Sequence, residues 1–173
     1  MHSTSKNYKL SKSLFTGLCL TFFSLNAAAQ MTSVGSETLS NTTTANDQKE
    51  AATAMDGSGN YVIVWASEDE DGWDNGVYFQ RYLSDGTANG TPVKANNTTD
   101  YSQRKPDVAM ADDGTFVICW QSQYEDTDGW GVWFALYDNT GTLITRNRVN
   151  DSSSDEQVDP KVAMNYDGDF VVG

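Results

Sequence analysis

The sequence has little cysteine, histidine, proline or positive charge. Its 173 residues include 2 Cys, 1 His and 3 Pro, with 11 Lys and Arg against 24 Asp and Glu. Beyond the first thirty residues only Cys119 remains, so that part of the chain cannot form an internal disulfide. The single histidine is His2, which excludes His-based triads, His metal sites and His general bases from the rest of the chain. Any chemistry there would depend on carboxylates, Tyr or Lys.

The charge balance also excludes two classes of partner. The formal net charge is −13, and such a field repels phosphate backbones and anionic lipid headgroups while attracting cations and basic surfaces. We therefore expect no nucleic acid and no membrane surface among the partners. A long apolar run is missing too, because residues 14–25 are too short for a span of about twenty residues.

The N-terminus instead has the pattern of a bacterial signal peptide. Lysines precede the apolar stretch 14–25, and small residues at 27–29 stand before Gln30. We predict that residues 1–29 are a signal peptide, cleaved after Ala29, and that the mature protein is secreted, extracellular or periplasmic. No membrane insertion is expected after the signal is removed.

The rest of the chain is built from an internal repeat of about 55 residues. Ala54-Met55 recurs as Ala109-Met110 and Ala163-Met164, at offsets of 55 and 54 residues. Further residues keep the same phase: Asn41, Asn96 and Asn150; Gln48, Gln103 and Gln157; Gly59, Gly114 and Gly168; Trp65 and Trp120. Such a period indicates stacked supersecondary units. The predicted organisation is an orphan last strand of a preceding repeat (30–41), repeat 1 (42–96), repeat 2 (97–150) and a truncated repeat 3 (151–173).

Each full unit predicts four short strands and no helix. In the second unit they are expected at 107–111, 115–121, 132–138 and 143–150, with a hairpin turn at 112–114. The second strand is apolar on both faces, which indicates an inner, covered strand. The fold class is therefore all-β, with four-stranded antiparallel repeats in a partial β-propeller-like array. A β-sandwich or another stacked β repeat is the alternative.

The second unit also resembles a known kind of repeat. The stretch 107–122, with Gly131-Val132-Trp133-Phe134 downstream, is similar to propeller-like repeats of large bacterial secreted and cell-surface proteins. The resemblance covers residues 41–173. It implies an extracellular module without assigned catalysis, often in arrays with adhesion or calcium-binding modules.

Acidic loops follow the second strand in both units. The first contains Asp69 and Asp71 before a glycine, and the second contains Asp126 and Asp128 before another. Alternating carboxylates followed by Gly can wrap Ca²⁺, which takes six to eight oxygen ligands. The EF-hand pattern is not met, so a calcium site and a merely solvated acidic loop both remain open.

A tryptophan follows each of these loop glycines. Trp73 and Trp130 beside carboxylates are candidates for a sugar platform, the ring face contacting C–H groups and the acids accepting from hydroxyls. Packing between adjacent sheets is the alternative for both. The strand residues Trp65, Trp120 and Trp133 are assigned to the core.

These patterns favour a non-catalytic secreted or cell-surface repeat module for binding or adhesion, with calcium as an optional cofactor. Its expected partner is a glycan or a surface protein. A carbohydrate-active, sialidase-like propeller and a purely structural spacer are the alternatives. The third unit stops inside its second strand, and the resulting open sheet edge predicts self-association or a place in a longer assembly.

Overall fold

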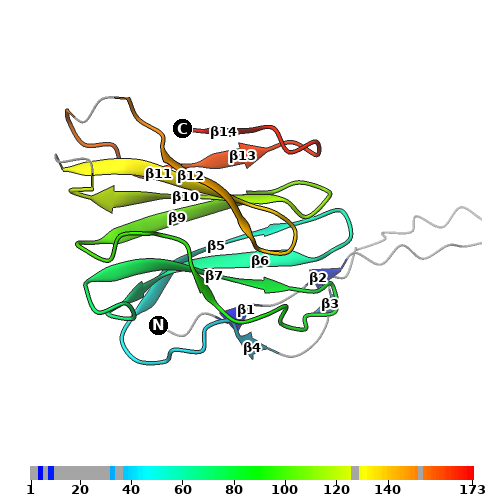
Figure 1. The fold of residues 1–173 in the computed structure, drawn as a ribbon. Coiled ribbons are helices and arrows are strands. Elements are labelled where there is room, and N and C mark those ends of the chain that lie inside the picture. Colours follow the sequence, from blue (N-terminus) through cyan, green and yellow to red (C-terminus); the bar gives the residue numbers. More distant parts are fainter. Residues whose placement is uncertain (1–3, 6–7, 10–31, 34–36, 126–128, 152–153) are drawn as a thin grey trace, which may run out of the picture.

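The protein is all-β. The structure is a computed structural model that describes residues 4–5, 8–9, 32–33, 37–125, 129–151 and 154–173 (Figure 1). These residues form antiparallel strands and contain no helix. Within them, no helix is therefore long and apolar enough to cross a membrane. The predicted signal segment 14–29 lies outside the described residues.

Two four-stranded antiparallel sheets make up most of the molecule. Strands follow one another in each sheet, so both are up-and-down meanders. The first contains β5 (Gln48–Met55), β6 (Tyr61–Glu68), β7 (Asn75–Tyr82) and β8 (Val93–Lys94). The second contains β9 (Gln103–Met110), β10 (Phe116–Gln123), β11 (Trp130–Tyr137) and β12 (Leu143–Arg148). This confirms the predicted fold class of four-stranded antiparallel sheets in a partial propeller-like array.

Three two-stranded sheets flank them. β13 (Val162–Met164) pairs with β14 (Phe170–Val172) beside the second sheet. On the other side, β1 (Thr4–Ser5) pairs with β4 (Thr38–Leu39), and β2 (Tyr8–Lys9) pairs with β3 (Thr32–Ser33). The first strands β5, β9 and β13 lie side by side, as the innermost strands of neighbouring propeller blades do (Figure 1).

The same tight turn joins the first two strands of each unit. In the second unit Ala111 N donates to Thr115 O at 2.8 Å, and Gly114 N donates to Ala111 O at 3.1 Å. Gly114 has φ of 88°, a left-handed conformation that glycine adopts without steric cost. The same pair of hydrogen bonds recurs at 56–60 and 165–169.

The core lies between the two large sheets. Residues 61–66 of β6 and 116–121 of β10 are all buried, so the apolar second strands are covered on both faces as expected. Trp65 and Trp120 are core residues, whereas Trp133 is only partly buried against the same cluster. Cys119 is also buried, and this burial raises the pKa of its thiol to about 12, which makes it a poor nucleophile.

Aromatic contacts join each sheet to the next. The ring of Phe79, in the third strand of the first sheet, lies 5.3 Å from that of Phe116 and 4.8 Å from that of Tyr137. Phe134, at the same place in the second sheet, lies 5.3 Å from Phe170. A third-strand Phe therefore packs on the second-strand Phe of the following unit at both junctions.

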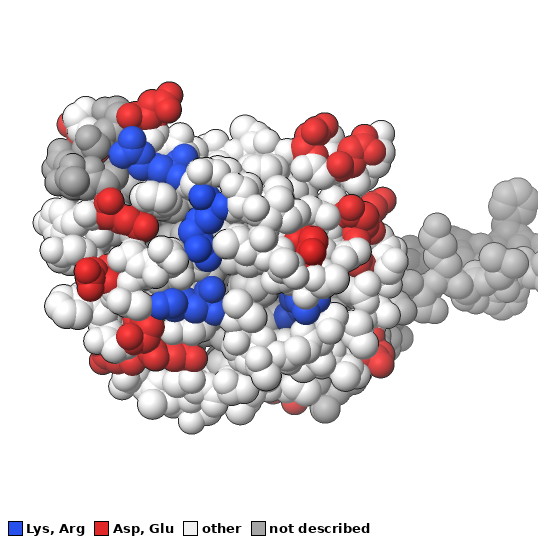
Figure 2. Space-filling view, in the orientation of Figure 1, with Lys and Arg blue, Asp and Glu red and all other residues white. Residues whose placement is uncertain are grey.

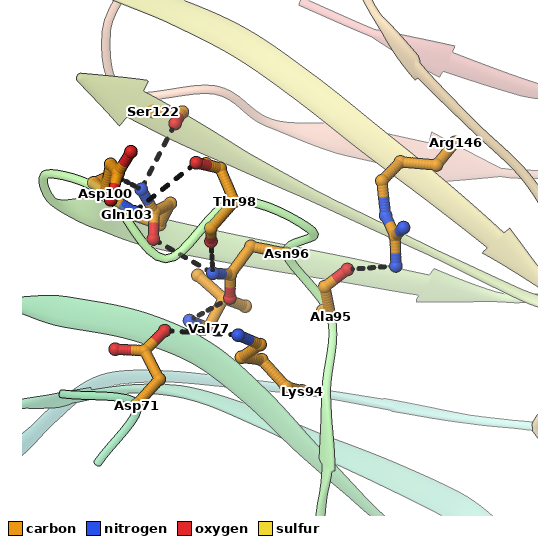
Figure 3. Close-up of polar contacts among 10 residues, drawn as sticks. All are labelled: Asp71, Val77, Lys94, Ala95, Asn96, Thr98, Asp100, Gln103, Ser122 and Arg146. Carbon is orange, nitrogen blue, oxygen red and sulfur yellow. Dashed lines mark hydrogen bonds and ion pairs between the residues drawn. The ribbon is translucent and has the colours of Figure 1, made fainter. Parts of the chain in front are cut away.

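A buried Asn–Gln pair, which we call the clasp, forms the polar part of the junction (Figure 3). Asn96 is 2% exposed and Gln103 is completely buried. Asn96 Nδ2 donates to Gln103 Oε1 at 2.9 Å and to Thr98 O at 2.6 Å, while Asn96 Oδ1 accepts from Val77 N at 2.8 Å. The clasp thus ties the third strand of one unit to the first strand of the next.

The clasp recurs at each repeat. Asn150 Nδ2 donates to Gln157 Oε1 at 2.8 Å, and Asn150 Oδ1 accepts from Val132 N at 3.0 Å. Asn41 Nδ2 donates to Gln48 Oε1 at 2.9 Å. The asparagines and glutamines that revealed the period in the sequence are therefore structural.

The repeat also extends to unusual backbone angles. Positive φ occurs at Asn46, Tyr101 and Asp155, which are spaced by the repeat, and at Asp69 and Tyr124, which are 55 residues apart. Because side chains other than Gly, Asn and Asp rarely adopt such angles, these positions are fixed by the fold rather than by the local sequence.

Candidate functional site

The candidate site lies at the loop end of the two large sheets. The β6–β7 loop, the segment before β9 and the β10–β11 loop all reach this end, on the left in Figure 1. The up-and-down topology places the tight β5–β6 and β9–β10 turns at the opposite end. Long connections at one end of a rigid scaffold are a common location for binding residues.

Three exposed aromatic side chains form a row at this end. Trp73 is 52% exposed, Tyr101 45% and Tyr124 50%. The ring centroids of Trp73 and Tyr101 are 6.3 Å apart, those of Tyr101 and Tyr124 are 5.2 Å apart, and both contacts are edge-to-face. We call Trp73, Tyr101 and Tyr124 the aromatic row. It crosses from the loop of the first sheet to the loop of the second.

The two tyrosines of the row have left-handed backbones. Tyr101 has φ of 62° and Tyr124 has φ of 55°. The equivalent residues elsewhere in the repeat are Asn46, Asp155 and Asp69, which tolerate this conformation better. A bulky residue in the left-handed region costs on the order of 1–2 kcal/mol. Two strained tyrosines that leave half their surface in water are therefore poorly explained by stability alone.

Acidic residues of the β6–β7 loop lie beneath Trp73. The Asp71 side chain is 6% exposed and forms an ion pair with Lys94, Nζ to Oδ2 at 3.5 Å (Figure 3). A Cβ atom at Gly76 would lie only 2.9 Å from Asp71 Oδ2, so glycine is needed for this close approach. Glu70 accepts from Thr43 Oγ1 at 2.9 Å. Burial, then Asp71 and Glu70, raise the pKa of Tyr78 well above its ordinary value.

The predicted calcium ligands are only partly placed. Asp69 N donates to Asp74 O at 2.7 Å, which closes the loop, and Asp71 binds Lys94. The oxygens Asp71 Oδ1 and Glu70 Oε2 are buried without a hydrogen-bond partner. Within the described part of the chain, no three His, Cys, Asp or Glu side chains converge as a metal site. Asp126 and Asp128 lie outside that part, so calcium binding stays a prediction.

The two predicted platform tryptophans differ in position. Trp73 lies in its loop, whereas Trp130 is the first residue of β11 and pairs with Gln123, as Asn75 pairs with Glu68. The β10–β11 loop is two residues shorter than the β6–β7 loop, which moves Trp130 from a loop position onto the strand. The Arg104 guanidinium lies 4.8 Å from the Trp130 ring centroid, a cation–π contact that covers one face. Trp130 is thus not part of the aromatic row.

The sequence analysis did not identify Tyr101 and Tyr124. Both positions were available in the repeat alignment as aromatics where other units carry Asn or Asp. Tyr101 corresponds to Asn46 and Asp155, and Tyr124 to Asp69. A search for positions that depart from the repeat would have found them.

The charges are distributed unevenly over the face shown in Figure 2. Asp and Glu side chains gather toward both ends of the sheets, and Lys and Arg side chains lie mainly between them. The loop end with the aromatic row is therefore acidic. This field favours neutral or cationic ligands over anionic ones.

Two clefts lie away from the aromatic row. One of about 340 Å³ at the turn end includes Asp56, Asp113 and Arg81 in its lining. Asp56 Oδ1 accepts from Ser58 N and Asn60 N, and Asp113 Oδ1 accepts from Thr115 N. These carboxylates thus hold the turns.

The second cleft, of about 270 Å³, lies beside the first strands of the three units. It is lined in part by Glu50, Lys105 and Asp159, residues at equivalent repeat positions. Lys105 Nζ lies 3.7 Å from Glu50 Oε1 and 3.6 Å from Asp159 Oδ1. The three charges pair with one another along the strands, so their role here is to join the units.

Comparison with known proteins gives little further information. No protein-family model and no curated protein matches the sequence. Among solved structures, the chain is similar to the crystal structure of endo-arabinase from Bacteroides thetaiotaomicron, with 17% identity and a TM-score of 0.47 over 82% of this chain. The match covers 55% of that structure, so the chain spans little more than half its length. At this identity and TM-score, the likeness assigns no substrate and no activity to the chain.

Proposed function

We propose that the protein is an exported, non-catalytic binding module that holds a glycan on the aromatic row. The observation that carries this proposal is the row itself: Trp73, Tyr101 and Tyr124 are in mutual contact, and each leaves about half its surface to solvent. Aromatic faces take the C–H groups of sugar rings, and rigid aromatic side chains lose little conformational entropy on binding.

The backbone strain supports a role in recognition. Tyr101 and Tyr124 adopt left-handed angles where other units have Asn or Asp. Strain of this kind is concentrated at binding sites, where the surrounding structure over-determines the backbone. The same strain presets the two rings, so less ordering is needed when a ligand binds.

The surrounding charge narrows the ligand class. The acidic side chains at the loop end favour neutral or amino sugars over sulfated or uronic acid polymers. This also disfavours the sialidase-like alternative, since a sialoside is an anion. The carbohydrate-active alternative would in addition need two carboxylates about 5–10 Å apart across a cleft.

A glycan array followed by calorimetry on the best ligand tests the proposal. We expect a neutral or amino-sugar ligand, and at least tenfold weaker binding by Trp73→Ala and by Tyr101→Ala, as base and sugar stacking on aromatics is worth about 1–3 kcal/mol per ring. Tyr166→Ala is the matched control, because Tyr166 is 70% exposed but not in the row. Equal affinity of all three variants, or an array with no ligand, would contradict the proposal.

Export is tested separately by the intact mass of the protein released from a bacterial host. We expect a mature chain that begins at Gln30. A released protein that still begins at Met1 would contradict the signal-peptide prediction without affecting the aromatic row.

A further inference from the structure

The first clasp lacks one hydrogen bond that the other two have. Asn41 is 7% exposed, and its Nδ2 donates to Gln48 Oε1 and to Thr43 O, as Asn96 Nδ2 does to the equivalent atoms. Its Oδ1 is buried and accepts no hydrogen bond. Asn96 Oδ1 and Asn150 Oδ1 each accept a main-chain N–H, from Val77 and Val132. A buried amide oxygen without a donor costs roughly 1–3 kcal/mol.

The missing donor is therefore known in type and position. In both complete clasps it belongs to a third strand, and to the valine of a Gly-Val-aromatic-Phe sequence, residues 76–79 and 131–134. Figure 3 shows this arrangement around Val77 and Asn96. Beside Asn41, Ser40 stands where Ala95 does in the next unit, and its Oγ is likewise buried without a partner.

The strand now beside this edge does not complete the clasp. β4 occupies the register of β8: Thr38 and Leu39 correspond to Val93 and Lys94. β8 pairs with Phe79 and Tyr78 of β7, whereas β4 pairs with Ser5 and Thr4 of β1. The short β1 thus lies at the third-strand position without donating to Asn41. It also belongs to the segment 1–29 that we expect export to remove.

We propose that the edge formed by Thr38–Leu39, Ser40 and Asn41 binds a β-strand of another polypeptide, and that this strand is the Gly-Val-aromatic-Phe third strand of a repeat of the same type. Its valine N–H bonds to Asn41 Oδ1. Its Phe has the chemistry of Phe79, which packs on Phe116 and Tyr137; that pair recurs as Tyr61 and Tyr82, stacked at 4.8 Å. Strand addition of this kind draws affinity from main-chain hydrogen bonds and specificity from alternate side chains.

Peptides that differ by one methyl group test this without changing the protein. The probe has the sequence of β7, residues 75–82, with solubilising lysines and a fluorophore, and its binding to the purified chain is followed by anisotropy. One derivative is N-methylated at the valine equivalent to Val77, which removes the donor. The control derivative is N-methylated at the next residue, equivalent to Tyr78, whose N–H points to the opposite edge of the strand.

We expect the unmodified and control peptides to bind similarly, and the valine-methylated peptide to bind about tenfold more weakly or worse, the loss expected for one buried hydrogen bond. On the Asn41→Leu protein, the two methylated peptides should bind alike, because the acceptor is gone. The proposal is overturned if the probe does not bind, if a scrambled probe binds equally well, or if both methylations weaken binding to the same extent on the unmodified protein.

Discussion

The first and second sheets follow one plan strand for strand, yet their loop ends differ. Asp69 and Asn46 of the first unit correspond to Tyr124 and Tyr101 of the second, with the same left-handed backbone. The first unit alone places a tryptophan, Trp73, in the β6–β7 loop. The comparison teaches that the repeat determines the backbone, while departures from it indicate which surfaces have a further role.

The clasps offer the sharpest way to test how far the two units are equivalent. Asn96→Ala leaves Val77 N and Gln103 Oε1 buried without partners, so we expect it to lower the free energy of unfolding by about 3–4 kcal/mol. Asn41→Ala loses the same contact to Gln48, but no strand donates to its Oδ1. It should therefore cost about 1–3 kcal/mol less than Asn96→Ala.

Urea denaturation of the two variants measures this difference. Asn150→Ala, whose Oδ1 accepts from Val132 N, is the third member of the series and should resemble Asn96→Ala more than Asn41→Ala. Equal losses for Asn41→Ala and Asn96→Ala would show that the first clasp is already complete, and would also remove the basis of the strand-binding proposal.

Much of this framework was predictable from the sequence, because a repeat displays the same constraint more than once. The all-β class, the turns around Gly114 and the buried second strands followed from periodicity and turn chemistry. The strand ends differed by a few residues: β9 begins at Gln103 rather than at 107, because the bulged start of the strand has no alternating apolar pattern.

The binding surface was less predictable. Trp73 was proposed correctly as an exposed aromatic, but Trp130 was paired with it because Asp-Gly-Trp occurs in both loops. The register places Trp130 opposite Gln123 in the strand ladder, and a motif match cannot reveal a two-residue difference in loop length. Contact between Tyr101 and Tyr124 depends on tertiary structure, since one precedes β9 and the other follows β10.

Calcium provides a second way to distinguish the units. We expect weak binding at the acidic loops, with Kd on the order of 10⁻⁴ to 10⁻³ M as in extracellular modules. At 10 mM Ca²⁺ and a Kd near 1 mM, binding would raise the free energy of unfolding by about 1.4 kcal/mol. Thermal melts with Ca²⁺ and with NaCl of equal ionic strength measure this.

Variants assign the calcium effect to one loop. Asp71→Asn should abolish the effect of the first loop and the double variant Asp126→Asn, Asp128→Asn that of the second, whereas Asp167→Asn, in the β13–β14 turn, should leave the shift unchanged. No heat of binding and no thermal shift in the unmodified protein would leave the solvated-loop interpretation.

The strained tyrosines provide a test in which stability and binding change in opposite directions. Tyr101→Asn places in the second unit the residue that the first unit has at Asn46. We expect it to raise the free energy of unfolding by about 1 kcal/mol, because Asn tolerates the left-handed backbone better, and to weaken glycan binding at the same time. Tyr101→Phe, which keeps the ring and the strain, should change stability little. A Tyr101→Asn protein that is less stable would show that the ring contributes packing rather than recognition.

The smallest expected effect concerns the turns between the third and fourth strands, which use different carboxylates in the two units. Asp138 Oδ1 accepts from Thr140 Oγ1, Thr140 N and Thr142 N, and these bonds lower the pKa of Asp138. Asp85 accepts from Thr87 N, which lowers the pKa of Asp85. A carboxyl with a lowered folded-state pKa stabilises the protein above its unfolded-state pKa of about 3.9, and this contribution is lost as the pH falls through the folded-state value.

Both groups are fully exposed, so solvent screening keeps the contribution small. The difference in urea midpoint between the unmodified protein and Asp138→Asn should therefore be present at pH 6 and shrink toward pH 2, and the same should hold for Asp85→Asn. Because Asp138 accepts three bonds and Asp85 accepts a single main-chain bond, the Asp138 effect should be the larger. A difference that grows on acidification would contradict the assignment of these bonds to the folded state.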